Sequence, residues 1–149
     1  MVKVTGGNLL AGRLKDIAAK IGSGPTVQVG WFPDATYRDG TLVAMVAAIQ
    51  EFGAPKRNIP PRPFFRSIIK AHQAEWPEAI AANLAANDFD AARTLGQVGE
   101  VIAGQLAESI TAGSYTPLKP TTVAAKGFDK PLVDTGRMLQ SIKSVVKSE

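Results

Sequence analysis

The 149-residue chain contains no cysteine. This absence excludes disulfide bonds, thiolate nucleophiles, iron–sulfur clusters and zinc sites with cysteine ligands. The sequence also lacks a run of about 18 apolar residues, the minimum for a membrane-spanning helix, and its start lacks the features of a secretory signal. We therefore expect no membrane partner, and a cytoplasmic location in the cell that makes the protein.

Motifs of catalysis are missing as well. The sequence has no P-loop, no G-x-G-x-x-G of dinucleotide-binding proteins and no G-x-S-x-G of serine hydrolases. The single histidine, His72, is spaced with Phe65, Ile69 and Trp76 on one helical face, which favours a packing role. A hydrolase is an alternative only if His72 meets a serine and an aspartate in the fold. We expect no enzyme activity, no metal and no cofactor.

Charge is spread thinly, with a net value of +4 from 17 basic and 13 acidic residues. Asp34 and Asp39 flank a loop and could hold a divalent cation, but such carboxylates more often form turns. Arg57, Arg62 and Arg66 form a modest basic strip that could contact phosphates, although ion pairs and solvation explain such spacing more often. A small nucleic-acid-binding factor using this strip is therefore the alternative function.

The composition is 45% hydrophobic and 20% charged, which is typical of one folded domain over residues 1–149. Helical periodicity predicts helices over residues 8–21, 41–52, 64–76, 79–86 and 90–112, with a kink or a restart at Pro77. Alternation of apolar residues predicts a strand over residues 26–32 and a terminal strand near residues 142–146, which we expect to pair. The expected fold class is α+β, with a small antiparallel sheet packed against several helices and an extended proline-rich arm or connector.

Two of the predicted helices carry specific expectations. The helix over residues 41–52 should begin with Thr41 as its N-cap, end at Gly53 and bury its large apolar face. The glycines of the helix over 90–112 each cost about 1 kcal/mol relative to alanine, so we expect them to permit a tight helix–helix contact. The apolar face comprises Leu42, Met45, Val46, Ile49 and Phe52, and the glycines are Gly96, Gly99 and Gly104.

The connector APKRNIPPRP at residues 54–63 contains four prolines, which disfavour both helix and central strand. It leads directly into Phe64 and Phe65. A stiff arm with a hydrophobic tip loses little entropy when it docks on a neighbouring subunit. The two rings could equally anchor the connector to the core of their own chain, and the residues alone leave both interpretations open.

Two segments carry a resemblance to a known family: EFGAPKRNIPPRPFF at residues 51–65 and TPLKPTTVAAKGFDKPLVDTGRMLQSI at residues 116–142. They are similar to the signatures of the small tail-component and tail-completion proteins of long-tailed, lambda-like bacteriophages. The resemblance covers about residues 25–70 and 113–146. The matching positions are Glu51, Phe52, Gly53, Ile59, Pro60, Arg62, Pro63, Phe64, Pro117, Leu118, Thr122, Lys126, Pro131, Leu132, Asp134, Thr135, Gly136 and Ser141.

The resemblance implies a small α+β protein without catalytic residues, which assembles as a ring at the neck or the head-proximal end of the tail. Such a ring joins or closes the tail tube. The implied partners are further copies of the chain and other neck or tail proteins, with room for DNA to pass through the ring without specific contact. The implied location is the virion, reached from the host cytoplasm.

The interaction residues expected from these segments lie in the connector at residues 54–63, at the two phenylalanines after it, and in a second connector at residues 130–138. We hypothesise that Arg62 pairs with a carboxylate such as Asp134 and clamps the connectors together, and that Asp134 or Thr135 caps the helical turn that follows. Gly53 and Gly136 should adopt backbone angles closed to other residues. The candidate residues are Ile59, Pro60, Arg62, Pro63, Phe64, Phe65, Asp134, Thr135, Gly136 and Arg137.

Overall fold

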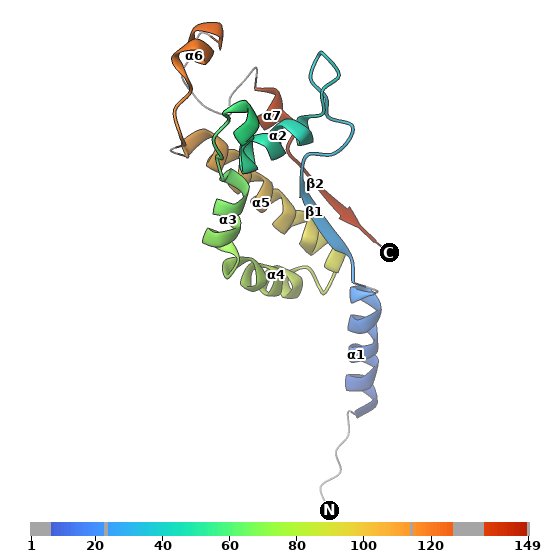
Figure 1. Ribbon diagram of the computed structural model, residues 1–149. Helices are drawn as coiled ribbons and strands as arrows, with labels where there is room; N and C mark the ends of the chain where they lie inside the picture. The colour runs from blue at the N-terminus through green and yellow to red at the C-terminus, as the bar shows by residue number, and fades with distance from the viewer. Residues whose placement is uncertain (1–6, 23, 114, 127–135, 149) are drawn as a thin grey trace, which may run out of the picture.

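The computed structural model describes residues 7–22, 24–113, 115–126 and 136–148 (Figure 1). This part contains seven α-helices, one 3-10 turn and a two-stranded antiparallel sheet, so the predicted α+β class is confirmed. None of its helices is long and apolar enough to span a membrane. The elements are α1 (Gly7–Ile21), β1 (Thr26–Gly30), α2 (Val43–Phe52), η1 (Pro55–Arg57), α3 (Phe64–His72), α4 (Glu75–Ala86), α5 (Ala91–Ala112), α6 (Pro120–Lys126), α7 (Arg137–Gln140) and β2 (Lys143–Lys147).

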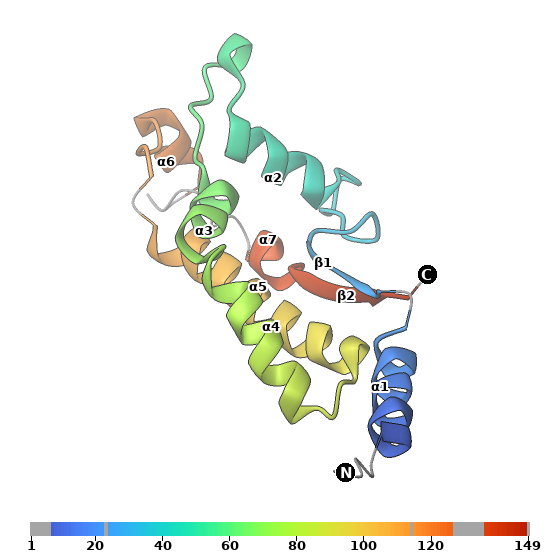
Figure 2. The ribbon, with the colours of Figure 1, turned by 90° about the horizontal axis from the view of Figure 1, so that it is seen from below.

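Helix α5 is the centre of the molecule. The sheet packs on one side of it, and α3 and α4 pack on the other (Figures 1 and 2). Helices α2 and α7 lie together at one end, whereas α1 projects from the opposite end (Figure 1). The core lies where α2, α3, α5 and α7 meet. Its buried members are Ala35, Val43, Ala47, Phe64, Ile68, Leu106, Ile110 and Met138.

The sheet joins two segments that are more than 100 residues apart in the sequence. Val27 pairs with Val146 and Val29 with Ser144, which confirms the predicted terminal strand and its partner. Just after β1, the Trp31 Nε1 donates a hydrogen bond to the Met138 carbonyl oxygen at 2.7 Å. This bond fixes α7 beside the end of β1.

Two of the three glycines of α5, Gly96 and Gly99, face the sheet. An ideal Cβ built on Gly99 would lie 2.7 Å from Val27 Cγ2 and 2.9 Å from Ser144 Cβ, closer than real Cβ contacts permit. A Cβ on Gly96 would lie 3.8 Å from Val146 Cγ2, and one on Gly104 would meet nothing within 4 Å. The expected helix–helix contact at these glycines is therefore wrong, because the close neighbour is the β1–β2 sheet.

Substituting Gly99 and Gly104 with alanine is expected to change stability in opposite directions. Gly99→Ala gains helix propensity but overpacks the α5–sheet contact, so we expect a net loss of about 1 to 2 kcal/mol. Gly104→Ala gains the same propensity in open space and should stabilise by roughly 0.5 to 1 kcal/mol. Urea denaturation of the two variants measures both changes, and a stabilised Gly99→Ala protein would contradict the close contact.

Three local expectations need correction. Thr41 does not cap α2: Leu42 occupies the N-cap position without a side-chain bond, and the Asp39 carboxylate accepts a hydrogen bond from the Thr41 amide at 3.0 Å. The proline-rich connector contains the one-turn helix η1, because proline fits the first turn of a helix. The helix expected over residues 64–76 is divided into α3 and α4, although Pro77 does lie in the first turn of α4, where a kink or a restart was predicted.

Candidate interaction surface

Glu51, the first residue of the segment EFGAPKRNIPPRPFF at residues 51–65, is 5% exposed and joins α2 to α3. Its carboxylate accepts hydrogen bonds from the backbone N–H of Phe65 at 2.8 Å and of Arg66 at 3.2 Å. These amides belong to the first turn of α3, where N–H groups have no partner within the helix. The Arg66 Nε donates to the same carboxylate at 2.7 Å. Glu51 therefore supplies, from a different helix, the cap that Pro63 cannot give to α3.

Arg62 is 4% exposed and connects three segments. Its Nη1 donates to Gln50 Oε1 at 2.5 Å, its Nε donates to the Thr116 carbonyl oxygen at 3.2 Å, and its backbone N–H donates to the Gln50 carbonyl oxygen. Burial lowers the pKa of the Arg62 guanidinium. Arg62 thus links the connector at residues 54–63 to the start of the segment at residues 116–142. The proposed partner Asp134 lies outside the described residues.

The two phenylalanines after the connector have different surroundings. Phe64 is 1% exposed and meets the Trp31 ring edge-on, with ring centroids 5.7 Å apart. Phe64 therefore anchors the connector to the core of its own chain, and the interpretation of this ring as the tip of a docking arm is wrong. Phe65 is only half-buried, and Ile59 and Pro60 are partly exposed. Pro63 is exposed.

Helix α2 has the reverse of the usual arrangement of polar and apolar side chains. Its two polar residues, Gln50 and Glu51, turn inward to Arg62 and to the start of α3. Its large apolar residues turn outward, with Met45 51% exposed and Phe52 64% exposed. The buried residues of α2 are Val43, Ala47 and Glu51, so the predicted burial of its large apolar face is wrong. The outer face of α2 carries no charged side chain, which is typical of a helix that is covered on both sides.

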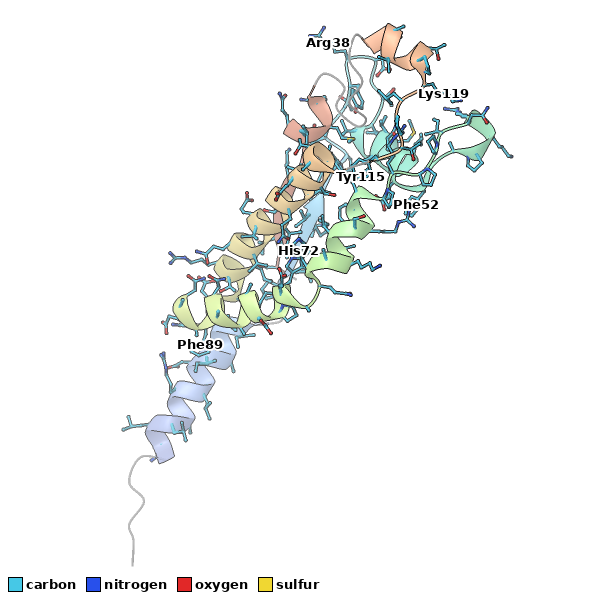
Figure 3. The ribbon with its side chains drawn as sticks, turned by 90° about the vertical axis from the view of Figure 1, so that its left-hand side faces the viewer. Arg38, Phe52, His72, Phe89, Tyr115 and Lys119 are labelled. Carbon is cyan, nitrogen blue, oxygen red and sulfur yellow. The ribbon has the colours of Figure 1, made fainter. Side chains whose placement is uncertain are left out.

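A groove lies beside this outer face, between α2, the end of β1 and α3. It has a volume of about 400 Å³. Phe52 stands where α2 meets the start of α3 (Figure 3), and the Arg66 guanidinium lies 5.0 Å from the centroid of its ring. The apolar residues lining the groove include Val29, Trp31, Ala48, Phe52, Phe65 and Ile69. We call this groove and the outer face of α2 the α2–α3 surface.

The second segment, residues 116–142, is described over residues 116–126 and from Gly136 onward. Gly136 precedes α7 with φ of 69°, and Gly53 follows α2 with φ of 75°, so both glycines adopt the expected backbone angles. The Arg137 Nε donates to the Thr36 carbonyl oxygen at 2.9 Å, and the Arg137 side chain is otherwise exposed. Asp134 and Thr135, expected to cap α7, lie outside the described residues.

Most of the described residues that the alternative functions would use have other contacts. The Nδ1 of His72 lies 2.8 Å from Glu75 Oε2, and in the described part no serine hydroxyl bonds to His72. In the basic strip, Arg62 is buried and Arg66 pairs with Glu51. Of the three arginines, Arg57 is the one whose guanidinium has no such contact and could bind a phosphate.

The loop carboxylates have structural partners. A hydrogen bond from Lys143 holds the pKa of Asp34 below its ordinary value. The backbone N–H of Thr41 does the same for the pKa of Asp39, which forms the turn before α2. No three histidine or acidic side chains of residues 7–22, 24–113, 115–126 and 136–148 lie close enough together to hold a metal ion.

The α2–α3 surface contains residues that the sequence did not indicate as exposed, chiefly Met45, Phe52 and Ile69. The sequence did contain a sign of this arrangement. The polar residues of α2 are adjacent to each other near the end of an otherwise apolar helix. Comparison of the chain with protein-family models, with curated proteins and with solved structures found no match.

Proposed function

We propose that the chain is a non-enzymatic structural protein of a bacteriophage virion, which self-associates as a ring at the neck or the head-proximal end of the tail. The ring would join or close the tail tube and would contact other neck or tail proteins, with DNA passing through it without specific contact. The resemblance of the two connector segments supports the viral setting. The α2–α3 surface supports self-association.

The outward apolar face of α2 is the observation that carries the proposal. Met45 and Phe52 remain in water in a single subunit, whereas Gln50 and Glu51 occupy the interior. Burial of apolar surface contributes about 25 cal/mol per Å² removed from water, so a second protein that covers this face gains substantial free energy. The segment at residues 51–65 holds the outer face of α2 in place, because Glu51 and Arg62 fix both ends of the connector between α2 and α3.

Charged substitutions on this face are expected to weaken assembly without unfolding the subunit. Met45→Glu and Phe52→Glu place a carboxylate on a surface that we expect to be buried between subunits, and should raise the concentration for half-assembly by at least about tenfold. The subunit should lose less than about 1 kcal/mol, because both side chains are exposed within it. Light scattering over a concentration series, with thermal denaturation alongside, separates the two effects.

Val101→Glu provides the matched control. Val101 is 57% exposed and apolar, but it lies on α5 away from the α2–α3 surface. Equal weakening by Val101→Glu would show a general charge effect and would contradict the proposed surface. The viral role is tested separately by electron microscopy of particles assembled without this chain. Intact particles with joined, closed tails would reject a role in the neck or tail end.

A further inference from the structure

The α2–α3 surface and the outer face of α4 are complementary in charge. We propose that the groove between α2 and α3 of one subunit binds the outer face of α4 of a second copy of the chain. This inference rests on the proposed self-association and identifies the two surfaces that form the contact.

The groove has an apolar floor, and Lys70 on α3, the neighbour of the lining residue Ile69, makes its rim cationic. Arg66 and Lys70 lie one turn apart on α3, so their side chains share one side of that helix. The acidic residue lining the groove, Glu51, is buried, and its carboxylate is already occupied by Arg66 and by the amides of α3. Lys70 is exposed and forms no ion pair with any described residue. A partner of this groove should therefore combine small or apolar side chains with a carboxylate.

Helix α4 has this combination on its outer side. It carries Glu75 and Glu78 and no lysine or arginine, and none of its residues is buried. Glu78 is exposed and has no ion-pair partner in the described part of the chain. Ala81, Ala82 and Ala85 follow it at helical spacing and are also exposed. The inner side of α4 is held against α5, where Trp76 Nε1 donates to Gln105 Oε1 at 3.0 Å.

The exposed apolar side chains of the α2–α3 surface also have small side chains opposite them in this contact. Phe52 and Ile69 project from the α2–α3 surface, being 64% and 38% exposed. The alanines of α4 leave a shallow surface into which such side chains can pack. In this arrangement Glu78 approaches Lys70, so the contact buries apolar area while it pairs opposite charges at its edge.

Helix α1 is the rival occupant, because Leu9, Leu10 and Leu14 are all more than half exposed. Its charge argues against it: Arg13, Lys15 and Lys20 outnumber Asp16, so α1 would bring positive charge to the cationic rim of the groove. Arg13 and Lys20 are also engaged with Asp88 at the far end of the molecule, where their hydrogen bonds lower the pKa of that carboxyl. The α4 face has the opposite charge and is the better partner.

The contact would join two different surfaces of the same chain. Each bound pair would therefore leave one groove and one α4 face uncovered, and further copies would add until the assembly closes. A contact of this kind produces a ring when the rotation between neighbours closes, which agrees with the proposed function.

Disulfide trapping tests the pairing, since the natural chain contains no cysteine and gives no background. Single variants Phe52→Cys, Ala82→Cys and Leu14→Cys are mixed in pairs and oxidised, and the linked products are identified by mass spectrometry. A disulfide forms only when the two Cα atoms come within about 7 Å, so the product reports the contact. We expect the linkage between positions 52 and 82 to form at least about tenfold faster than the linkage between 52 and 14 or between two copies of 52.

A dominant linkage between positions 52 and 14 would overturn the proposal in favour of α1. A dominant linkage between two copies of position 52 would overturn it in favour of a two-fold symmetric contact. If no pair links while light scattering still shows assembly, this pairing fails and self-association stands; if assembly is absent as well, both fail. Charge reversal gives a second measurement: Lys70→Glu and Glu78→Lys should each weaken assembly roughly tenfold, and the double variant should recover most of it.

Discussion

Replacing Glu51 with alanine is expected to lower the free energy of unfolding by about 3 kcal/mol. The substitution removes the carboxylate that accepts the amides of Phe65 and Arg66, leaving the first turn of α3 without its cap. It also removes the partner of the Arg66 guanidinium, although Arg66 is half exposed and can be solvated in its place. Most of the lost stability therefore comes from the two amides at the start of α3. Urea denaturation at constant pH measures this loss.

Two controls define the source of this effect. Glu51→Gln keeps the volume and one oxygen acceptor, so it should lose about half as much stability as Glu51→Ala. Glu108→Ala removes a carboxylate from the exposed side of α5 and should change the free energy of unfolding by less than about 0.5 kcal/mol. If Glu51→Ala proves as mild as Glu108→Ala, the carboxylate does not cap α3.

The inward position of Glu51 also accounts for the outward position of Phe52. Adjacent residues on a helix point about 100° apart, so Gln50 and Glu51 cannot reach Arg62 and α3 unless Phe52 turns toward solvent. The Arg66 guanidinium, held by Glu51, then lies over the exposed ring of Phe52. Glu51 thus acts in the interior of the protein, and its inward position leaves an apolar surface beside it.

Periodicity predicted the secondary structure well because it depends on local spacing. The alternation around Val27 and Val29 gave β1, and the terminal residues gave β2 and its antiparallel partner. The face of α2 could not be predicted in the same way. Periodicity assigns the larger apolar side chains to the interior, whereas here the burial of Glu51 depends on the amides of α3, which the fold brings to it from another segment.

The candidate site was predicted in part. The segments at residues 51–65 and 116–142 both contribute to the region around Arg62. The partners of Arg62, Gln50 and Thr116, were not predicted. The burial of Phe64 and Phe65 depends on the position of Trp31. Trp31 packs against Phe64, and Phe65 lines the groove. Neighbouring residues with the same chemistry therefore have different roles, and only tertiary packing separates them.

Gly53→Ala is expected to destabilise the protein by about 3 kcal/mol or more, which is a large part of the stability of an ordinary domain. Gly53 has φ of 75° and ψ of 172°, a region that residues with a Cβ rarely adopt. A Cβ at this position would also lie 2.8 Å from the Pro61 nitrogen and 2.9 Å from the Ile59 carbonyl oxygen. Both neighbours are backbone atoms of the connector, so no side-chain rotation can relieve the contact.

Gly40→Ala separates backbone strain from this steric contact. Gly40 has φ of 83°, but a Cβ there would meet nothing within 4 Å, so its substitution should cost only about 1 kcal/mol. Thermal and urea denaturation of the two variants should therefore differ by roughly 2 kcal/mol, the part due to the connector backbone. Equal losses would mean that the connector can move away from α2. In that case the rigid support proposed for the α2–α3 surface would be absent, and Phe52 would not be held in the position that assembly requires.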